Sequence, residues 1–177
     1  MRYFQKPRSL HLALLFVATA LFGCDHATKF AAIEHLEGHA PVALVPGWLD
    51  LRMTHNDDVA FSLFRRFDVA HHPLVLALLA SSVLFFVGAL WWRRRTSAPR
   101  LEQLGYAVVI AGALGNLADR LLRGYVVDFI HLRAWPVFNV ADIAVVVGAL
   151  LIGLSGLRGG GRPESTGERL PPTPGAA

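Results

Sequence analysis

Apolar residues are gathered in four long stretches of the chain, separated by polar segments. The clearest stretch, Leu74 to Trp92, holds no charged residue. The others run from Leu10 toward Ile33, from about Leu104 to Leu122 and from about Val137 to Leu157. A helix needs about 20 mostly apolar residues to cross the hydrocarbon core of a bilayer. The pattern therefore predicts an all-α membrane protein with four transmembrane helices.

Arginine and lysine residues mark one side of these helices. They precede the first helix, follow the second and follow the fourth: Arg2, Lys6 and Arg8, then Arg93, Arg94, Arg95 and Arg100, then Arg158 and Arg162. Because basic residues flanking membrane helices favour the cytoplasmic side, both termini are expected in the cytoplasm. Segments 34–72 and 123–136 then face outward, together with the polar ends of the first, third and fourth helices.

The outward segment 34–72 is too long for a simple turn. Its stretch from Trp48 to Met53 alternates as a strand does and leads into a polar run, so we expect a small extracytoplasmic β-element. Residues 1–157 are expected to form one four-helix membrane domain, because the helices are too few and too close in sequence to build two cores. Residues 158–177 are rich in Gly and Pro and are expected to form a disordered cytoplasmic tail.

The composition supports a membrane protein and argues against some classes of binding partner. Of the 177 residues, 54% are hydrophobic and 17% are charged, and the mean hydropathy is +0.44. A soluble domain of this size could not bury so much apolar surface. The formal net charge of +4 does not indicate a nucleic-acid partner, because the arginines stand in short clusters beside apolar runs. The single Cys24 excludes an internal disulfide and a cysteine-based metal cage.

Ionisable residues inside spanning helices cost about 2.5–3.5 kcal/mol or more each, so they mark candidate functional positions. Asp25 and Lys29 are four residues apart in the first helix and can pair across one turn. Such a pair could also do no more than anchor the helix end. The third helix carries a polar stripe at helical spacing, formed by Asn116, Asp119, Arg120 and Arg123. A buried network between helices would explain this stripe equally well.

Two aspartates stand at the outward ends of the last two helices. Asp128 follows the third helix in an apolar run, and Asp142 lies at the entrance of the fourth. Antiparallel helices would bring both carboxyls to one depth, and two close carboxyls in an apolar setting share a proton. Such a pair suits hydrolysis, because one carboxylate activates water while the other, protonated, polarises a carbonyl. A simple helix cap at Asp142 is an equally open interpretation.

Five blocks in order along the chain resemble the prolipoprotein signal peptidase family, also called signal peptidase II. The blocks are Asp25–Lys29 (DHATK), Asn56–Ser62 (NDDVAFS), Gly112–Arg120 (GALGNLADR), Gly124–Ile130 (GYVVDFI) and Phe138–Asp142 (FNVAD). The resemblance implies an aspartic peptidase of the bacterial inner membrane. Its substrates would be diacylglyceryl-modified prolipoproteins, cut just before the lipid-bearing cysteine. We expect no metal or other cofactor.

The resemblance also implies roles for individual residues. Asp128 and Asp142 would form the catalytic pair, near the outer face of the membrane. The residues that would orient the pair, hold the substrate backbone or complete the polar shell are Asp25, Lys29, Asn56, Asn116, Asp119, Arg120 and Asn139. The implied partners are lipid-modified prolipoproteins and membrane lipids, with no nucleic acid. The protein is expected to act as a monomer.

Two positions depart from the family pattern. Asp58 stands where the family usually has Gly, and Ile143 stands where a small hydroxyl residue is common. They leave open a catalytically impaired relative that binds lipopeptides or an inhibitor. A small proton-coupled transporter is a second alternative, because acids within membranes also relay protons. Two weaker interpretations are a zinc site at His35, Glu37 and His39, and a lipobox at Leu21–Cys24.

Overall fold

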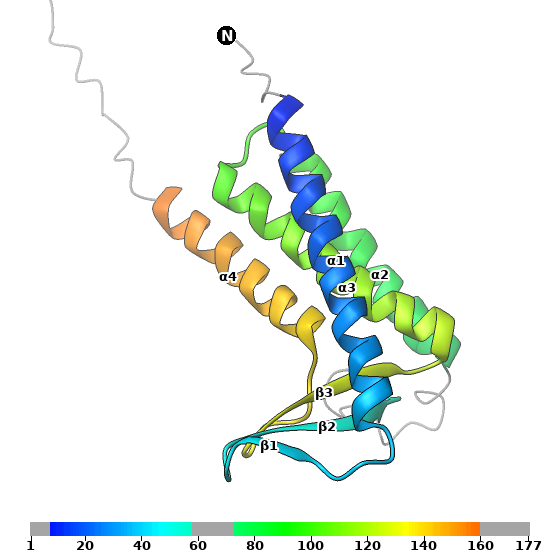
Figure 1. The fold of residues 1–177 in the computed structure, drawn as a ribbon. Coiled ribbons are helices and arrows are strands. Elements are labelled where there is room, and N and C mark those ends of the chain that lie inside the picture. Colours follow the sequence, from blue (N-terminus) through cyan, green and yellow to red (C-terminus); the bar gives the residue numbers. More distant parts are fainter. Residues whose placement is uncertain (1–7, 58–72, 160–177) are drawn as a thin grey trace, which may run out of the picture.

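In the computed structural model, which describes residues 8–57 and 73–159, a bundle of helices carries a small sheet across one end (Figure 1). The helices are α1 (Arg8–Leu36), α2 (Pro73–Arg94), α3 (Arg100–Arg123) and α4 (Val140–Gly159). The strands are β1 (Val42–Val45), β2 (Leu49–Asn56) and β3 (Val126–Leu132). All four helices are long and apolar enough to cross a membrane, which confirms the predicted fold class.

Helix α3 is the centre of the bundle. It packs against α1, α2 and α4, and its contact with α4 is the most extensive. Small residues allow this approach: a Cβ added at Gly112 would lie 2.4 Å from the Ala141 carbonyl oxygen. One added at Gly148 of α4 would lie 2.7 Å from the Gly105 carbonyl oxygen. The backbones of α3 and α4 therefore meet directly, as small residues permit between membrane helices.

The helix ends differ from the prediction, most clearly in α4. The apolar pattern placed its start near Val137, but the helix begins at Val140. Phe138 instead forms a bridge with Ile130 at the edge of the sheet, and its backbone N–H donates to the Ile130 carbonyl at 2.9 Å. The other end of α4 runs beyond Leu157, so Arg158 and Gly159 belong to the helix and not to a tail. The remainder of the predicted tail, 160–177, lies outside the described residues.

The strands form an antiparallel sheet in the order β1-β2-β3. The predicted strand at 48–53 is confirmed as β2, although it continues to Asn56 through part of the expected polar run. The prediction missed β3. Its buried residues Val127 and Phe129 pack against Ala32 and Leu36 at the end of α1. This small core attaches the sheet to the helices, and it sets Asp128, between the two core residues, on the opposite face of β3.

The two ends of the bundle are different in character. Helix α1 begins and helix α4 ends at the end away from the sheet (Figure 1). That end also holds Arg94, whose Nε lies 2.7 Å from a Glu102 carboxylate oxygen. The opposite end, next to the sheet, holds the polar residues of α1, α3 and α4. The predicted gathering of polar helix ends on one side is therefore a feature of the fold.

Candidate active site

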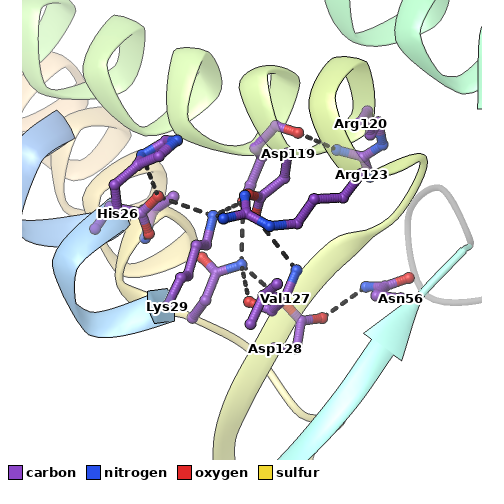
Figure 2. A network of polar contacts seen from close by, with 12 residues as sticks. His26, Lys29, Asn56, Asp119, Arg120, Arg123, Val127 and Asp128 are labelled. Carbon is purple, nitrogen blue, oxygen red and sulfur yellow. Dashed lines mark hydrogen bonds and ion pairs between the residues drawn. The ribbon is translucent and has the colours of Figure 1, made fainter. Parts of the chain in front are cut away.

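The predicted site residues come together between the bundle and the sheet, although they are far apart in sequence. They come from β2 (Asn56), β3 (Asp128), the residue before α4 (Asn139), α4 (Asp142), α1 (Asp25 and Lys29) and α3 (Asn116, Asp119 and Arg120). One continuous set of hydrogen bonds and ion pairs links them, part of which is drawn in Figure 2. The extended backbone of β3 and the first turn of α4 thus present the two aspartates to a shared network.

Asp128 is almost fully buried, with 2% of its surface exposed. Its Oδ2 accepts a hydrogen bond from Asn56 Nδ2 at 2.7 Å, and its Oδ1 accepts one from Asn139 Nδ2 at 2.7 Å. Burial raises the pKa of Asp128 to about 6, and the negative charge of Asp142 adds to this effect. The two amide hydrogen bonds and the charge of Lys29 lower the pKa and so oppose the increase.

Asp142 occupies the first turn of α4 and does cap the helix. Its Oδ2 accepts a hydrogen bond from the backbone N–H of Asn139 at 3.1 Å, while its own N–H donates to Asn139 Oδ1 at 3.0 Å. This is a reciprocal capping box. Its second oxygen, Oδ1, accepts from Asn116 Nδ2 at 2.8 Å. The cap and the site are therefore compatible, because one carboxylate serves both.

Asn139 and Asn116 connect the two aspartates. Asn139 is fully buried and uses its amide nitrogen for Asp128 and its amide oxygen for the Asp142 backbone. Asn116 donates to Asp142, and its oxygen accepts from Asn139 Nδ2 and Lys29 Nζ, both at 3.0 Å. Each side-chain amide thus has partners for both its donor and acceptor groups. Such a satisfied network is rigid, which fixes the relative position of the carboxylates.

Lys29 is fully buried, and two carboxylates compensate its charge. Its Nζ lies 2.8 Å from Asp25 Oδ2 and 2.9 Å from Asp119 Oδ2 (Figure 2). The predicted pairing with Asp25 is confirmed, and the partner on α3 extends it into a triad. Asp25 also accepts from the Ala141 N–H at 2.9 Å, and Asp119 from the Val127 N–H at 3.3 Å. The triad therefore holds the backbone beside each aspartate of the pair.

The remaining charged residues of the site are the two arginines in the last turn of α3. Arg123 pairs with Asp119 one turn away, in the stripe that the sequence predicted (Figure 2). Arg120 donates from Nη1 to the Asn116 carbonyl oxygen at 3.2 Å. Its positive charge also acts on Asp142, Asp128 and Asp119. The charge of Arg120 thus acts on both members of the aspartate pair from the last turn of α3.

Two residues near the site were not among the predicted ones. His26 Nδ1 lies 3.7 Å from Asp25 Oδ2, and Thr54 is the cross-strand partner of Asp128. His26 could have been found, because it stands inside the DHATK block. The place of Thr54 depends on strand register, for which the sequence holds no local signal.

Other positions singled out in the sequence lie elsewhere. Glu37 Oε1 lies 3.3 Å from His55 Nε2, and the His39 ring nitrogen Nδ1 lies 2.9 Å from the Glu37 carbonyl oxygen. Among residues 8–57 and 73–159, no three His, Cys, Asp or Glu side chains are placed to hold a metal ion. Ile143 is 44% exposed on α4. Asp58 and the rest of its block through Ser62 lie outside the described residues.

Four membrane-length helices and two carboxylates joined through Asn139 at one end define a membrane protein with an acidic polar centre. Residues 17–158 match the sequence model of the family described as Signal peptidase (SPase) II. The chain therefore belongs to the signal peptidase II family, a family of aspartic peptidases. Membership of a peptidase family goes against the alternative of a proton-coupled transporter.

Individual relatives agree with this assignment. A lipoprotein signal peptidase of Mycobacterium tuberculosis is 38% identical over 152 residues, which cover 82% of this chain and 71% of the relative. One of Xanthomonas campestris is 34% identical over 171 residues, covering 92% and 99%. Two solved structures of a bacterial membrane enzyme share the fold with a TM-score of 0.68 each, at 23% and 22% identity. They cover 82% of this chain and 88% and 93% of their own.

Proposed function

We propose that this protein removes signal peptides from lipoprotein precursors and that Asp128 and Asp142 are its catalytic pair. The observation that carries the proposal is the joint hold on both carboxylates by Asn139, whose side chain binds Asp128 while its backbone N–H binds Asp142. Asp142 lies in the first turn of the spanning helix α4, and Asn139, just before that helix, joins Asp128 to it. A signal peptide lies in the bilayer, so its scissile bond reaches a pair at this depth.

The pair shares one proton near neutral pH. The raised pKa of Asp128, about 6, makes a singly protonated pair accessible in this range. One carboxylate takes a proton from water, whose oxygen attacks the scissile carbonyl carbon, while the other carboxyl donates its proton to the carbonyl oxygen. Collapse of the tetrahedral intermediate breaks the C–N bond, and a proton from the pair goes to the departing amine. The products are the signal peptide and the free α-amino group of the cysteine.

The neighbouring residues divide into two groups in this mechanism. Asn56, Asn116, Asn139 and Arg120 orient the pair or hold the substrate backbone, since they contact or act on its carboxylates. Asp25, Lys29 and Asp119 are a scaffold: Asp25 and Asp119 bind the backbone next to the pair, and Lys29 joins these two carboxylates. This arrangement supports preorganisation: the donors are in place before the substrate arrives.

The same site also indicates the chemical class of the substrate and the location of the protein in the cell. We infer that the substrate carries a diacylglyceryl group on the cysteine after the cut, since its acyl chains anchor that cysteine at the membrane boundary. The protein acts as a monomer among membrane lipids of the bacterial inner membrane, with both termini in the cytoplasm and the pair near the outer face. The exposed Arg93 and Arg94 in the last turn of α2 and Arg158 in the last turn of α4 support this orientation.

The test is cleavage of a lipidated precursor by purified Asp128→Asn and Asp142→Asn variants. Each substitution removes the proton chemistry with little change in shape, so turnover should fall about 10²- to 10⁴-fold. Asp50→Asn is the matched control, because Asp50 is a carboxylate of the same sheet that binds Arg52 and His131 instead. The control should keep nearly normal turnover. Near-normal cleavage by either variant of the pair would show that the catalytic assignment is wrong.

A further inference from the structure

The end of β2 carries Asn56, and the sheet supports this end of the strand from one side. In the described part of the chain, β1 pairs with β2 as far as Leu51, so the later residues of β2 pair with β3 alone. The register between β2 and β3 is irregular between Leu51 and Thr54 and becomes regular again from Thr54 to Asn56. From there Asn56 reaches Asp128 on β3 (Figure 2). This hydrogen bond therefore depends on a short segment of strand with a neighbour on one side.

A cavity of about 400 Å³ lies beside the same segment. Its walls are the end of α1, the turn that follows it and residues 52, 53 and 55 of β2. Because protein interiors are normally close-packed, a hollow of this size means that the turn gives β2 little support by packing. The contact between Glu37 Oε1 and His55 Nε2, which lie 3.3 Å apart, joins the two walls.

His55 lies on the face of β2 opposite to Asn56, because consecutive residues of a strand point to opposite faces. Its ring lies against that of Tyr125, with the ring centres 4.1 Å apart and the planes inclined by 31°. Tyr125 packs against the small core between α1 and β3, and Glu37 directly follows Leu36 of that core. Through these two contacts, His55 ties the end of β2 to the core that attaches the sheet to the helices.

The charged groups around the cavity make Glu37 the ionic partner of His55. Arg52 and His39 also line the cavity. Arg52 binds both carboxylate oxygens of Asp50, at 2.6 and 2.8 Å, and His39 Nδ1 lies 2.9 Å from the Glu37 carbonyl oxygen. The Glu37 carboxylate can accept the hydrogen of His55 Nε2 whether the imidazole is neutral or protonated. The contact is therefore available on both sides of the ionisation of the histidine.

We propose that His55 is a positioning residue: held by Glu37 and Tyr125, it fixes the end of β2 so that Asn56 remains bound to Asp128. It acts through the backbone, since His55 and Asn56 are consecutive residues of one strand. Its contribution is to geometry more than to stability. The side chains of His55 and Glu37 are 44% and 50% exposed, and an exposed ion pair stabilises a fold very little. The inference rests on the proposed function, because it concerns the proton of the catalytic pair.

The test is the pH–rate profile of cleavage by His55→Phe and Glu37→Ala. His55→Phe keeps a ring against Tyr125 and removes the group that contacts Glu37, and Glu37→Ala removes the other partner. A loosened strand end weakens the Asn56 hydrogen bond, which lowers the pKa of Asp128. Both variants should therefore shift the ionisation of the pair to higher pH, by about half a pH unit for partial loss of one hydrogen bond.

His35→Phe is the matched control, because His35 is an exposed histidine in the last turn of α1. Its profile should match that of the wild type. Thermal unfolding in detergent should change little in all three variants. A loss of turnover at every pH without a shift of the profile would mean that His55 only stabilises the fold, and the inference would fall.

The direction of the two shifts separates positioning from a direct effect of charge. His55 can carry a positive charge and Glu37 a negative one, so direct action of these charges on Asp128 would shift the two profiles in opposite directions. Loss of positioning shifts both to higher pH. When either change is combined with Asn56→Ala, the profile should match that of Asn56→Ala alone. Opposite shifts, or shifts that add to that of Asn56→Ala, would overturn the inference.

Failure of this inference is distinct from failure of the proposed function. Near-normal turnover of Asp128→Asn or Asp142→Asn would remove the catalytic pair itself. If those variants are inactive and Asn56→Ala shifts the profile, the pair and its contact with Asn56 stand. Profiles of the His55 and Glu37 variants that superimpose on the wild type would then show that His55 does not position Asn56.

Discussion

Asn139 concentrates three tasks in one buried residue. Its side-chain oxygen caps α4 by accepting the Asp142 N–H, its backbone N–H donates to the Asp142 carboxylate, and its side-chain nitrogen donates to Asp128. Its alternatives are few: Asp in its place would add a third carboxylate beside two others, and Ala would leave buried polar groups unpaired at about 1–3 kcal/mol each. The amide is the side chain that can donate to one aspartate and accept from the backbone of the other without adding charge.

Asn56 tunes the ionisation of Asp128, and its removal should change the pH dependence of the enzyme. The Asn56 N–H group stabilises the carboxylate form of Asp128, so the hydrogen bond lowers the pKa. Asn56→Ala removes that stabilisation, and the pKa of Asp128 should rise further above 6, by about one unit for a charged hydrogen bond of about 1.5 kcal/mol. The pH–rate profile should show the corresponding ionisation shifted to higher pH.

Thr54→Val is the control for this experiment, because Thr54 lies directly opposite Asp128 in the sheet and Val keeps its shape. Its profile should match the wild type. If the Asn56→Ala profile also superimposed on the wild type, Asn56 would not control the proton of the pair.

Among the elements, the packing of α3 on α4 determines where Asp142 lies. Gly112 faces the first turn of α4, where its missing side chain leaves room for the Ala141 carbonyl and the side chains of Ala144 and Val145. Ala141 also binds Asp25 through its N–H. A close helix contact and a buried ion pair thus fix the same turn, and Asp142 is the next residue along it.

Gly112→Ala should therefore destabilise the protein and reduce cleavage together. The new Cβ would meet the Ala141 carbonyl oxygen at 2.4 Å, so the helices must separate, at a cost of about 1–3 kcal/mol for an overpacked core. Thermal unfolding in detergent and turnover are the measurements. Gly153→Ala is the matched control on α4, because a Cβ there meets nothing within 4 Å. Equal unfolding temperatures for the two variants would contradict this account of the helix contact.

At the scale of the whole molecule, basic residues and buried carboxylates lie at opposite ends of the helix bundle. The basic residues in the last turns of α2 and α4 lie away from the sheet, while the buried carboxylates Asp25, Asp119 and Asp128 lie next to it. From this asymmetry we expect the basic end to lie on the cytoplasmic side of the membrane. In that orientation the carboxylate pair would lie on the side on which a lipid-anchored cysteine emerges after translocation.

Labelling with a membrane-impermeant thiol reagent checks this orientation in intact cells whose outer barrier has been opened. With Cys24 replaced, Asp57→Cys and Arg133→Cys should react from outside, since both positions are exposed at the sheet end. Ser97→Cys, in the exposed turn between α2 and α3, should react only after the cells are broken. Labelling of position 97 in intact cells would invert the orientation and place the pair on the cytoplasmic side.

The sequence by itself determined the four helices, the gathering of their polar ends and the contact between Asp25 and Lys29. These depend on hydrophobic length and on the helical repeat, which covalent geometry imposes on any chain. The helix cap at Asp142 could also be predicted from the sequence, because the two residues of a capping box are only three positions apart. The five blocks named the site residues through resemblance, without showing how they meet.

Tertiary structure alone decided how those residues are joined. Lys29 contacts Asp119 and Asn56 contacts Asp128, although each pair is more than 70 residues apart in the sequence. Strand β3 forms because α1 and β2 pack against it, and the irregularity between Leu51 and Thr54 determines which residue of β2 lies opposite Asp128. A shift of one residue in register would turn every side chain to the other face. Such pairings depend on how distant elements pack, and no local pattern in the chain encodes them.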